Sequence, residues 1–166
     1  NSTIRSLVIN GFDGNGLNLS EVPGDTVTDC RIGVNAAGTA VVPNTGDGIH
    51  IDTQGNNNVI GGTAAGEGNL ISGNGGGGIT VIAGINNTIQ GNLIGTDVTG
   101  QMDFGNGGDG ISLDSTTGNT IGGTTAAARN VISGNGGHGI LISSANNNAI
   151  QGNFIGTTIS GTAALG

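Results

Sequence analysis

Asn119-Thr120-Ile121-Gly122-Gly123-Thr124 is the stretch that decides the fold, because it repeats Asn58-Val59-Ile60-Gly61-Gly62-Thr63 at a constant offset in the numbering (121 − 60 = 61). The run 130–135, Asn-Val-Ile-Ser-Gly-Asn, repeats the run 69–74, Asn-Leu-Ile-Ser-Gly-Asn, at the same offset. Self-similarity at a fixed period is the sequence signature of a repeat architecture, in which each unit packs mainly on its neighbours. We therefore expect one unit, used more than once, to build the whole chain.

Each 61-residue unit divides into two halves that contain the same short pattern, Gly-apolar-x-apolar. Alternation with a period of two predicts a β-strand whose apolar side chains share one face. The first apolar residues of the five copies are Leu17, Ile49, Ile79, Ile111 and Ile140. Their numbers differ by 32, 30, 32 and 29 in turn, so each half has the size of one coil.

Two further short strands are expected in each coil, for example around Thr88-Ile89 and around Leu93-Ile94. No segment has the spacing of an amphipathic helix, and glycine interrupts every candidate. The Asn-Gly pairs at Asn74 and Asn106 are typical of hairpins, but residues about 30 positions apart match in type, which favours parallel stacking of coils. The sequence predicts an all-β parallel β-helix over residues 1–166, with about five to six coils of 29–32 residues and three strands per coil.

These runs resemble the right-handed parallel β-helices of the pectate-lyase-like class, in particular the Gly- and Asn-rich repeats of large bacterial surface or secreted proteins. The resemblance is carried by the Asn-x-Ile-x-Gly-Asn-x-Ile-Gly and Ile-Ser-Gly-Asn-Gly-Gly-x-Gly-Ile runs and covers nearly the whole chain. It implies a right-handed solenoid and a location outside a bacterial cell. Neither end has a capping pattern, so we expect a fragment of a longer solenoid, or ends that stack on other chains.

Asparagine recurs two positions before the inward-facing isoleucines, and this equal parity places its side chain inside the coil. Stacked one coil apart, the amides can hydrogen-bond along a column, which satisfies polar groups that are costly to bury. We expect two such structural ladders, with Asp25 and Cys30 in the equivalent places at their N-terminal ends. The ladders comprise Asn58, Asn87, Asn119 and Asn148 in one column and Asn69, Asn92, Asn130 and Asn153 in the other.

The same alternation along the strand predicts a column of apolar side chains that point outward from the last strand of each coil. It comprises Leu70, Leu93, Val131 and Phe154. Long apolar stripes are seldom left in contact with water, so we expect the loops 63–68, 96–105, 124–129 and 157–165 to cover it. The alternative is a docking stripe for another protein chain or a glycan.

The composition limits the partners. The net charge is −8, with three arginines and no lysine, which argues against nucleic acid and against an anionic membrane surface. No long apolar run predicts insertion into a membrane. Cys30 is the single cysteine, so no intrachain disulfide can form. The partners that remain are a polysaccharide or another protein chain.

The densest group of titratable residues lies on and beside the first strand of the coils. Its members are Asp47, His50, Asp52, Asp109, Ser112, Asp114 and His138. If coils rise by about 4.8 Å, Asp109 and His138 are neighbours and Asp47 lies about 9 to 10 Å from Asp109. Such a group could perform general base catalysis or glycoside hydrolysis.

These residues divide into candidate roles. Asp47, Asp109 and His138 are the catalytic candidates, and His50, Asp52, Ser112 and Asp114 are the binding candidates. The competing interpretation is structural, because acidic residues in Gly-rich turns are usually solvated or cap the turn backbone.

Pectate-lyase-like enzymes, by resemblance, hold Ca²⁺ with clustered carboxylates and use an arginine or lysine as base. No arginine stacks beside the acidic group here, so that arrangement is not carried over. We expect no metal centre and no cofactor, and we place any weakly held surface Ca²⁺ at Asp109 and Asp114.

Three functions are compatible with these patterns. The favoured one is a non-catalytic stalk or adhesive surface of a large extracellular protein. The second is a carbohydrate-active β-helix, a polysaccharide lyase, a glycoside hydrolase or a glycan-binding module, that uses the face of Asp47, His50, Asp109 and His138. The third, ice binding, rests on an outward threonine column of Thr26, Thr88 and Thr120 that Val59 and Ala149 interrupt.

Overall fold

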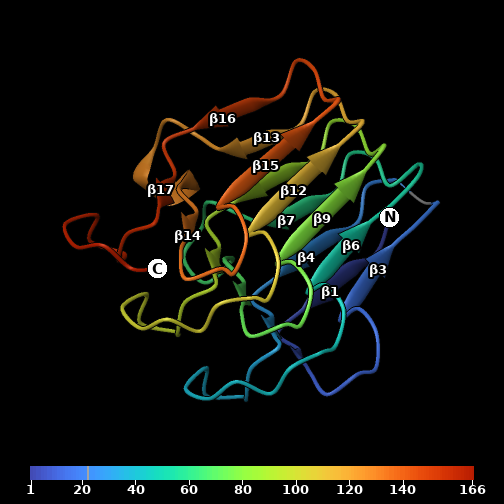
Figure 1. The fold of residues 1–166 in the computed structure, drawn as a ribbon. Coiled ribbons are helices and arrows are strands. Elements are labelled where there is room, and N and C mark those ends of the chain that lie inside the picture. The colour runs from blue at the N-terminus through green and yellow to red at the C-terminus, as the bar shows by residue number, and fades with distance from the viewer. Residues whose placement is uncertain (22) are drawn as a thin grey trace.

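The computed structural model describes residues 1–21 and 23–166 as a right-handed parallel β-helix (Figure 1). Three parallel sheets run along the solenoid, and each coil contributes one strand to each sheet. The first sheet contains β1 (Thr3–Arg5), β4 (Thr26–Thr28), β7 (Val59–Gly61), β10 (Thr88–Gln90), β13 (Thr120–Gly122) and β16 (Ala149–Gln151). This architecture confirms the fold expected from the repeat.

The second and third sheets complete the coil. The second sheet contains β2 (Val8–Ile9), β5 (Arg31–Ile32), β8 (Leu70–Ile71), β11 (Leu93–Ile94), β14 (Val131–Ile132) and β17 (Phe154–Ile155). The third sheet contains β3 (Leu17–Leu19), β6 (Ile49–Ile51), β9 (Ile79–Ile82), β12 (Ile111–Asp114) and β15 (Ile140–Ser143). Its strands form the broad diagonal sheet at the front of Figure 1.

Strand register follows the sequence repeat. Ile89 of β10 pairs with Ile60 of β7 on one side and with Ile121 of β13 on the other. Inward side chains of equal type therefore stack into columns, and the branched isoleucines fill the interior of each coil. Full burial of such a side chain contributes roughly 1.5–3 kcal/mol. The fully buried large side chains are Ile32, Ile49, Ile51, Ile60, Ile71, Ile79, Ile89, Ile94, Ile111, Leu113, Ile121 and Ile132.

Both expected asparagine ladders are present. In the second ladder, Asn92 Oδ1 accepts the backbone N–H of Asn69, and Asn92 Nδ2 donates to Asn130 Oδ1. In the first ladder, Asn58 Oδ1 accepts the N–H of Asp25, which takes the expected place at the N-terminal end of the column. Each amide thus links its own coil to the next one at a corner between two sheets.

A third ladder joins the end of the second sheet to the start of the third sheet. Asn44 Nδ2 donates to Asn74 Oδ1, Asn74 Nδ2 to Asn106 Oδ1, and Asn106 Nδ2 to Asn135 Oδ1. Three of these asparagines precede glycine, the dipeptide that also signals hairpins. Their side chains point inward and bond to the next coil, so each of these Asn-Gly pairs forms a corner of the solenoid.

Two kinds of loop alternate from coil to coil. Coils that contain β8 and β14 insert the segments 62–68 and 123–129 before the last strand, and the second insert holds a 3₁₀ turn, Ala126–Ala128. The coils that contain β5, β11 and β17 insert a short hairpin after the last strand, closed by the antiparallel bridges Val34–Val41, Thr96–Asp103 and Thr157–Ala164. The three hairpins project from the same side of the solenoid in Figure 1.

The hairpins stack on each other as well as on the coils. Val98 donates its backbone N–H to Gly38 O, and Ile159 donates to Gly100 O. A Cβ on Gly100 would lie 2.7 Å from Ile159 Cβ, so glycine is needed at this close approach. The hairpins therefore form a second, smaller stack with a spacing of two coils.

The loops cover the outward apolar column only in part. Leu70 is 5% exposed and Val131 is 3% exposed, as expected if loops fold over the column. Leu93 and Phe154 are half-buried. Hairpin residues supply the cover, since a Cβ on Gly38 would touch Leu70 Cδ2 and the side chain of Val98.

Candidate functional site

The third sheet presents a flat outer face on which most of the candidate residues lie. The outward residues of the central column, in strand order, are Asn18, His50, Thr80, Ser112 and Leu141. A second outward column runs from Asp52 through Ile82 and Asp114 to Ser143. The stacking of coils brings residues that are distant in sequence onto one surface.

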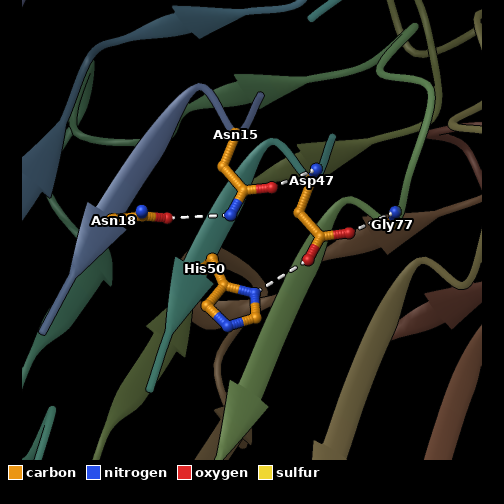
Figure 2. A network of polar contacts seen from close by, with 5 residues as sticks. All are labelled: Asn15, Asn18, Asp47, His50 and Gly77. Atoms are coloured by element: carbon orange, nitrogen blue, oxygen red, sulfur yellow. Dashed lines mark hydrogen bonds and ion pairs between the residues drawn. The ribbon is translucent and has the colours of Figure 1, made fainter. Parts of the chain in front are cut away.

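Asp47 is the centre of a polar network at the start of this sheet (Figure 2). Its Oδ1 accepts the backbone N–H of Gly77 at 2.7 Å, and its Oδ2 lies 2.9 Å from His50 Nδ1. The backbone N–H of Asp47 in turn donates to Asn15 Oδ1, and Asn15 Nδ2 donates to Asn18 Oδ1. Asp47 thus links three successive coils through residues 15, 47 and 77.

Asp109 and His138 form the second pair, as the stacking of coils predicts. Asp109 Oδ1 accepts the backbone N–H of His138 at 2.6 Å and lies 2.9 Å from His138 Nδ1. The His138 side chain is 69% exposed, against 22% for His50, so the two imidazoles differ in access to solvent. The sequence placed His138 beside Asp109 correctly but gave no sign of the contact between His50 and Asp47.

The coil that contains β9 separates the two pairs. It places Gly77, Thr80 and Ile82 between the coil of Asp47 and the coil of Asp109. Asp114 lies on the far column, where its Oδ1 accepts the Ser115 hydroxyl. Across residues 1–21 and 23–166, no three His, Cys, Asp or Glu side chains are arranged to hold a metal ion.

This geometry restricts the chemistry that the face can perform. An Asp–His pair can exchange a proton with a bound molecule. Yet one oxygen of each carboxylate accepts a backbone N–H from the next coil, which is the role that asparagine has in the ladders. Asp47 and Asp109 therefore each hold their own coil to the next at a corner of the solenoid.

The remaining candidates lie elsewhere. Thr26, Val59, Thr88, Thr120 and Ala149 do align on the first sheet, and the register confirms that Val59 and Ala149 interrupt the threonine column. Burial raises the pKa of the Cys30 thiol, and the charge of Asp29 adds to this shift. A raised pKa disfavours the thiolate that a reactive cysteine needs.

Two cavities lie away from the candidate face. They lie over the second sheet, against the outward apolar column and between the two kinds of loop. In the described part of the chain no helix has the length and apolar character needed to span a bilayer. A scan against protein-family models and searches among curated proteins and solved structures gave no match to this chain.

Proposed function

We propose that this chain is a non-catalytic repeat region of a large extracellular bacterial protein, where it acts as a stalk or an adhesive surface. The observation that carries the proposal is the use of Asp47 and Asp109 as links between coils. The carboxylates best placed for catalysis are bonded to the backbone of the scaffold. The extracellular setting rests on the resemblance of the Asn- and Gly-rich repeats.

The regular hydrogen bonding between coils suits a mechanical role. Parallel strands pair along the whole solenoid, and three ladders bond each coil to the next at its corners. Repeat architectures of this kind extend by adding similar units, so length can change without a new core. A stalk needs this combination of stiffness and modular length.

A second function is favoured by one observation, the polar central column of the third sheet. Asn18, His50, Thr80 and Ser112 stand in register on a flat surface that could contact the hydroxyl groups of an oligosaccharide. Under this alternative, Asp47, His50, Asp109 and His138 would bind or cleave a glycan.

A turnover assay separates the two functions. The purified chain is screened on a glycan array and tested with acidic and neutral polysaccharides for reducing ends and unsaturated products. We expect no turnover. Turnover that Asp109→Asn abolishes and Asp114→Asn preserves would overturn the proposal, because both variants remove one charge from the same face and only the first alters an Asp–His pair.

A further inference from the structure

Two cavities follow the outer face of the second sheet. The first, of about 500 Å³, lies over Arg31 and Leu70, between the loop 62–68 and Val98 of the middle hairpin. The second, of about 280 Å³, lies over Leu93 and Val131. Its walls are Ala126, Ala127 and Arg129 of the other loop and Ile159 of the last hairpin.

The two cavities are copies of one another. Val131 repeats Leu70 and Ile159 repeats Val98 at the period of the 61-residue unit, and Leu93 takes the place of Arg31. Leu93 and Gly91 line both cavities, as does Ala127, so the two form one continuous groove. Each 61-residue unit therefore contributes one pocket to the groove, and the next pocket lies two coils further along the solenoid.

The second pocket is smaller than the first, and larger side chains stand in its walls. Gly66, Gly68 and Val98 in the first pocket correspond to Ala127, Arg129 and Ile159 in the second. The guanidinium of Arg129 lies 3.9 Å from the centre of the Phe154 ring, and Arg129 Nε donates to Gly152 O. Gly68 provides no side chain at the equivalent place, which leaves the first pocket open.

The groove is rich in cationic side chains compared with the rest of this acidic molecule. The chain has three cationic Arg or Lys side chains and a net charge of −8. Two of them, Arg31 and Arg129, line the groove, one in each pocket. One carboxylate, that of Asp29, also lines the first pocket, where it accepts the Ser6 hydroxyl. Neither arginine forms an ion pair within the described residues. A ligand that carries carboxylates would complement these two arginines.

The floor of the groove is aliphatic. Leu70, Leu93 and Val131 form it, and the loop walls are mainly alanine and glycine. The lining amides of Asn69 and Asn92 are engaged in the ladder and leave no free side-chain amide for sugar hydroxyls. Apolar side chains fit this floor better than a carbohydrate does, so a peptide is the favoured occupant.

The spacing of the pockets selects a conformation for that peptide. Two coils correspond to about 9.5 Å, because neighbouring strands lie about 4.8 Å apart. A polyproline II helix places every third side chain on the same face at about 9.3 Å. An extended β-strand places alternate side chains about 6.6 Å apart and falls out of register with the pockets.

We propose that this groove binds an acidic segment of another protein chain in the polyproline II conformation. An apolar side chain at every third residue enters each pocket, and neighbouring carboxylates pair with Arg31 and Arg129. The groove lies on the second sheet, away from Asp47 and Asp109, so this binding does not depend on the function proposed above.

The test uses a synthetic peptide of four Pro-Leu-Glu triplets and a control peptide of the same composition in which leucines alternate with other residues. Isothermal titration calorimetry measures binding of both peptides to the folded chain. We expect the triplet peptide to bind and the control to bind much more weakly. Raised salt concentration should weaken the binding, because the ion pairs are partly exposed.

Matched variants locate the site. Arg31→Gln should weaken binding about three- to fivefold, the range expected for one partly exposed ion pair. Arg5→Gln removes the same charge from the first sheet and should leave binding unchanged. Leu93→Ser should weaken binding by removing part of the floor, whereas Ile82→Ser changes an exposed isoleucine on the third sheet and serves as its control.

Three outcomes would overturn the proposal. One is equal binding of the triplet and control peptides, or no binding of either at millimolar concentration. Another is an affinity that Arg31→Gln and Arg5→Gln reduce equally. The last is binding of acidic oligosaccharides, instead of the peptides, in a manner that Arg31→Gln abolishes. Thermal melting of each variant confirms that the fold is intact before affinities are compared.

Discussion

Asparagine is the residue that fixes the register between one coil and the next. Its amide both donates and accepts, so the same side chain can bond to equivalent side chains above and below it. Asn92 shows the full pattern, because its Nδ2 donates to Ile60 O, Gln90 O and Asn130 Oδ1 while its Oδ1 accepts from Asn69. Aspartate can accept but not donate when ionised, which suits Asp25 at the N-terminal end of its ladder better than a place in the centre.

Asn92→Ala should destabilise the fold by about 3 kcal/mol, because several buried partners lose a hydrogen bond at once. Asn146→Ala is the matched control, since Asn146 is exposed and contributes only backbone hydrogen bonds. Its effect should stay within about 0.5 kcal/mol. Urea denaturation measures both values, and a similar small change in the two variants would contradict the structural role of the ladder.

At the scale of the element, two of the hairpins close their turns with related residues. Asp97 closes the turn of the middle hairpin, where its Oδ1 accepts the backbone N–H groups of Gln101 and Met102 and its Oδ2 accepts the Thr99 hydroxyl. Asn35 has the same role in the first hairpin, where its Oδ1 accepts the N–H groups of Thr39 and Ala40. The two hairpins thus use the same turn with an ionisable and a neutral residue.

The Asp97 carboxylate makes the middle hairpin dependent on pH. Burial raises its pKa, but the hydrogen bonds from Thr99, Met102 and Gln101 together lower the pKa below its ordinary value of 3.8. Because the pKa is lower in the folded state, the stabilisation is present above pH 3.8 and is lost as pH falls through the folded-state pKa.

Asp97→Asn should keep the hairpin at neutral pH, as Asn35 does in the first hairpin, and should remove this part of the acid sensitivity. Urea midpoints measured at neutral pH and at about pH 3 test the prediction. The midpoint of the unsubstituted chain should fall further on acidification than that of the variant. An equal fall in both would show that the Asp97 carboxylate does not contribute to acid sensitivity.

Predictions from the sequence succeeded where the alternation of side chains along a strand determines whether a residue points inward or outward. The ladders of Asn58 and Asn69 follow from an asparagine two positions before an inward isoleucine. The ladder of Asn74 was missed because a glycine follows that asparagine and resembles a turn signal. The alternation along a strand does not say where a residue in a turn points. The repetition of the Ile-Ser-Gly-Asn run from one unit to the next was the signal that could have revealed this third ladder.

The candidate site could also be predicted in part from the sequence. Stacking placed His138 beside Asp109, because one period separates their coils. Contacts within a corner, such as that of His50 with Asp47, depend on side-chain rotamers that a period does not specify. The groove was not predictable either, since the difference between buried Leu70 and half-buried Leu93 is set by how the loops fold over them.

At the scale of the whole molecule, the 61-residue unit should be removable. Deletion of residues 77–137 joins Gly76 to His138, which has the same place in its coil as Gly77. The ladders of Asn58 and Asn69 then continue across the junction to Asn148 and Asn153, and the third ladder keeps Asn44 and Asn74. The backbone N–H of His138 can donate to Asp47 in place of Gly77. We expect this variant to fold into a shorter solenoid. Its circular dichroism spectrum should have the same shape as that of the full chain.

Deletion of residues 77–108 is the control, because it removes a single coil and also keeps strand register. It brings the loops 62–68 and 123–129 onto adjacent coils and removes the hairpin that separates them. This variant should melt at a lower temperature than the variant that lacks the full unit. A lower melting temperature for the 77–137 deletion would show that the coil alone, and not the pair of coils, is the structural unit.

The third ladder also bears on the chemical ageing of the chain. Asn-Gly pairs are the sites at which proteins deamidate most readily, since the glycine nitrogen can attack the asparagine side chain. Here Gly75, Gly107 and Gly136 donate their N–H groups to the preceding coil, while Asn74, Asn106 and Asn135 have their amides bonded in the ladder. Neither reacting group is free to move, so the arrangement that joins the coils also preserves the side chains that form it.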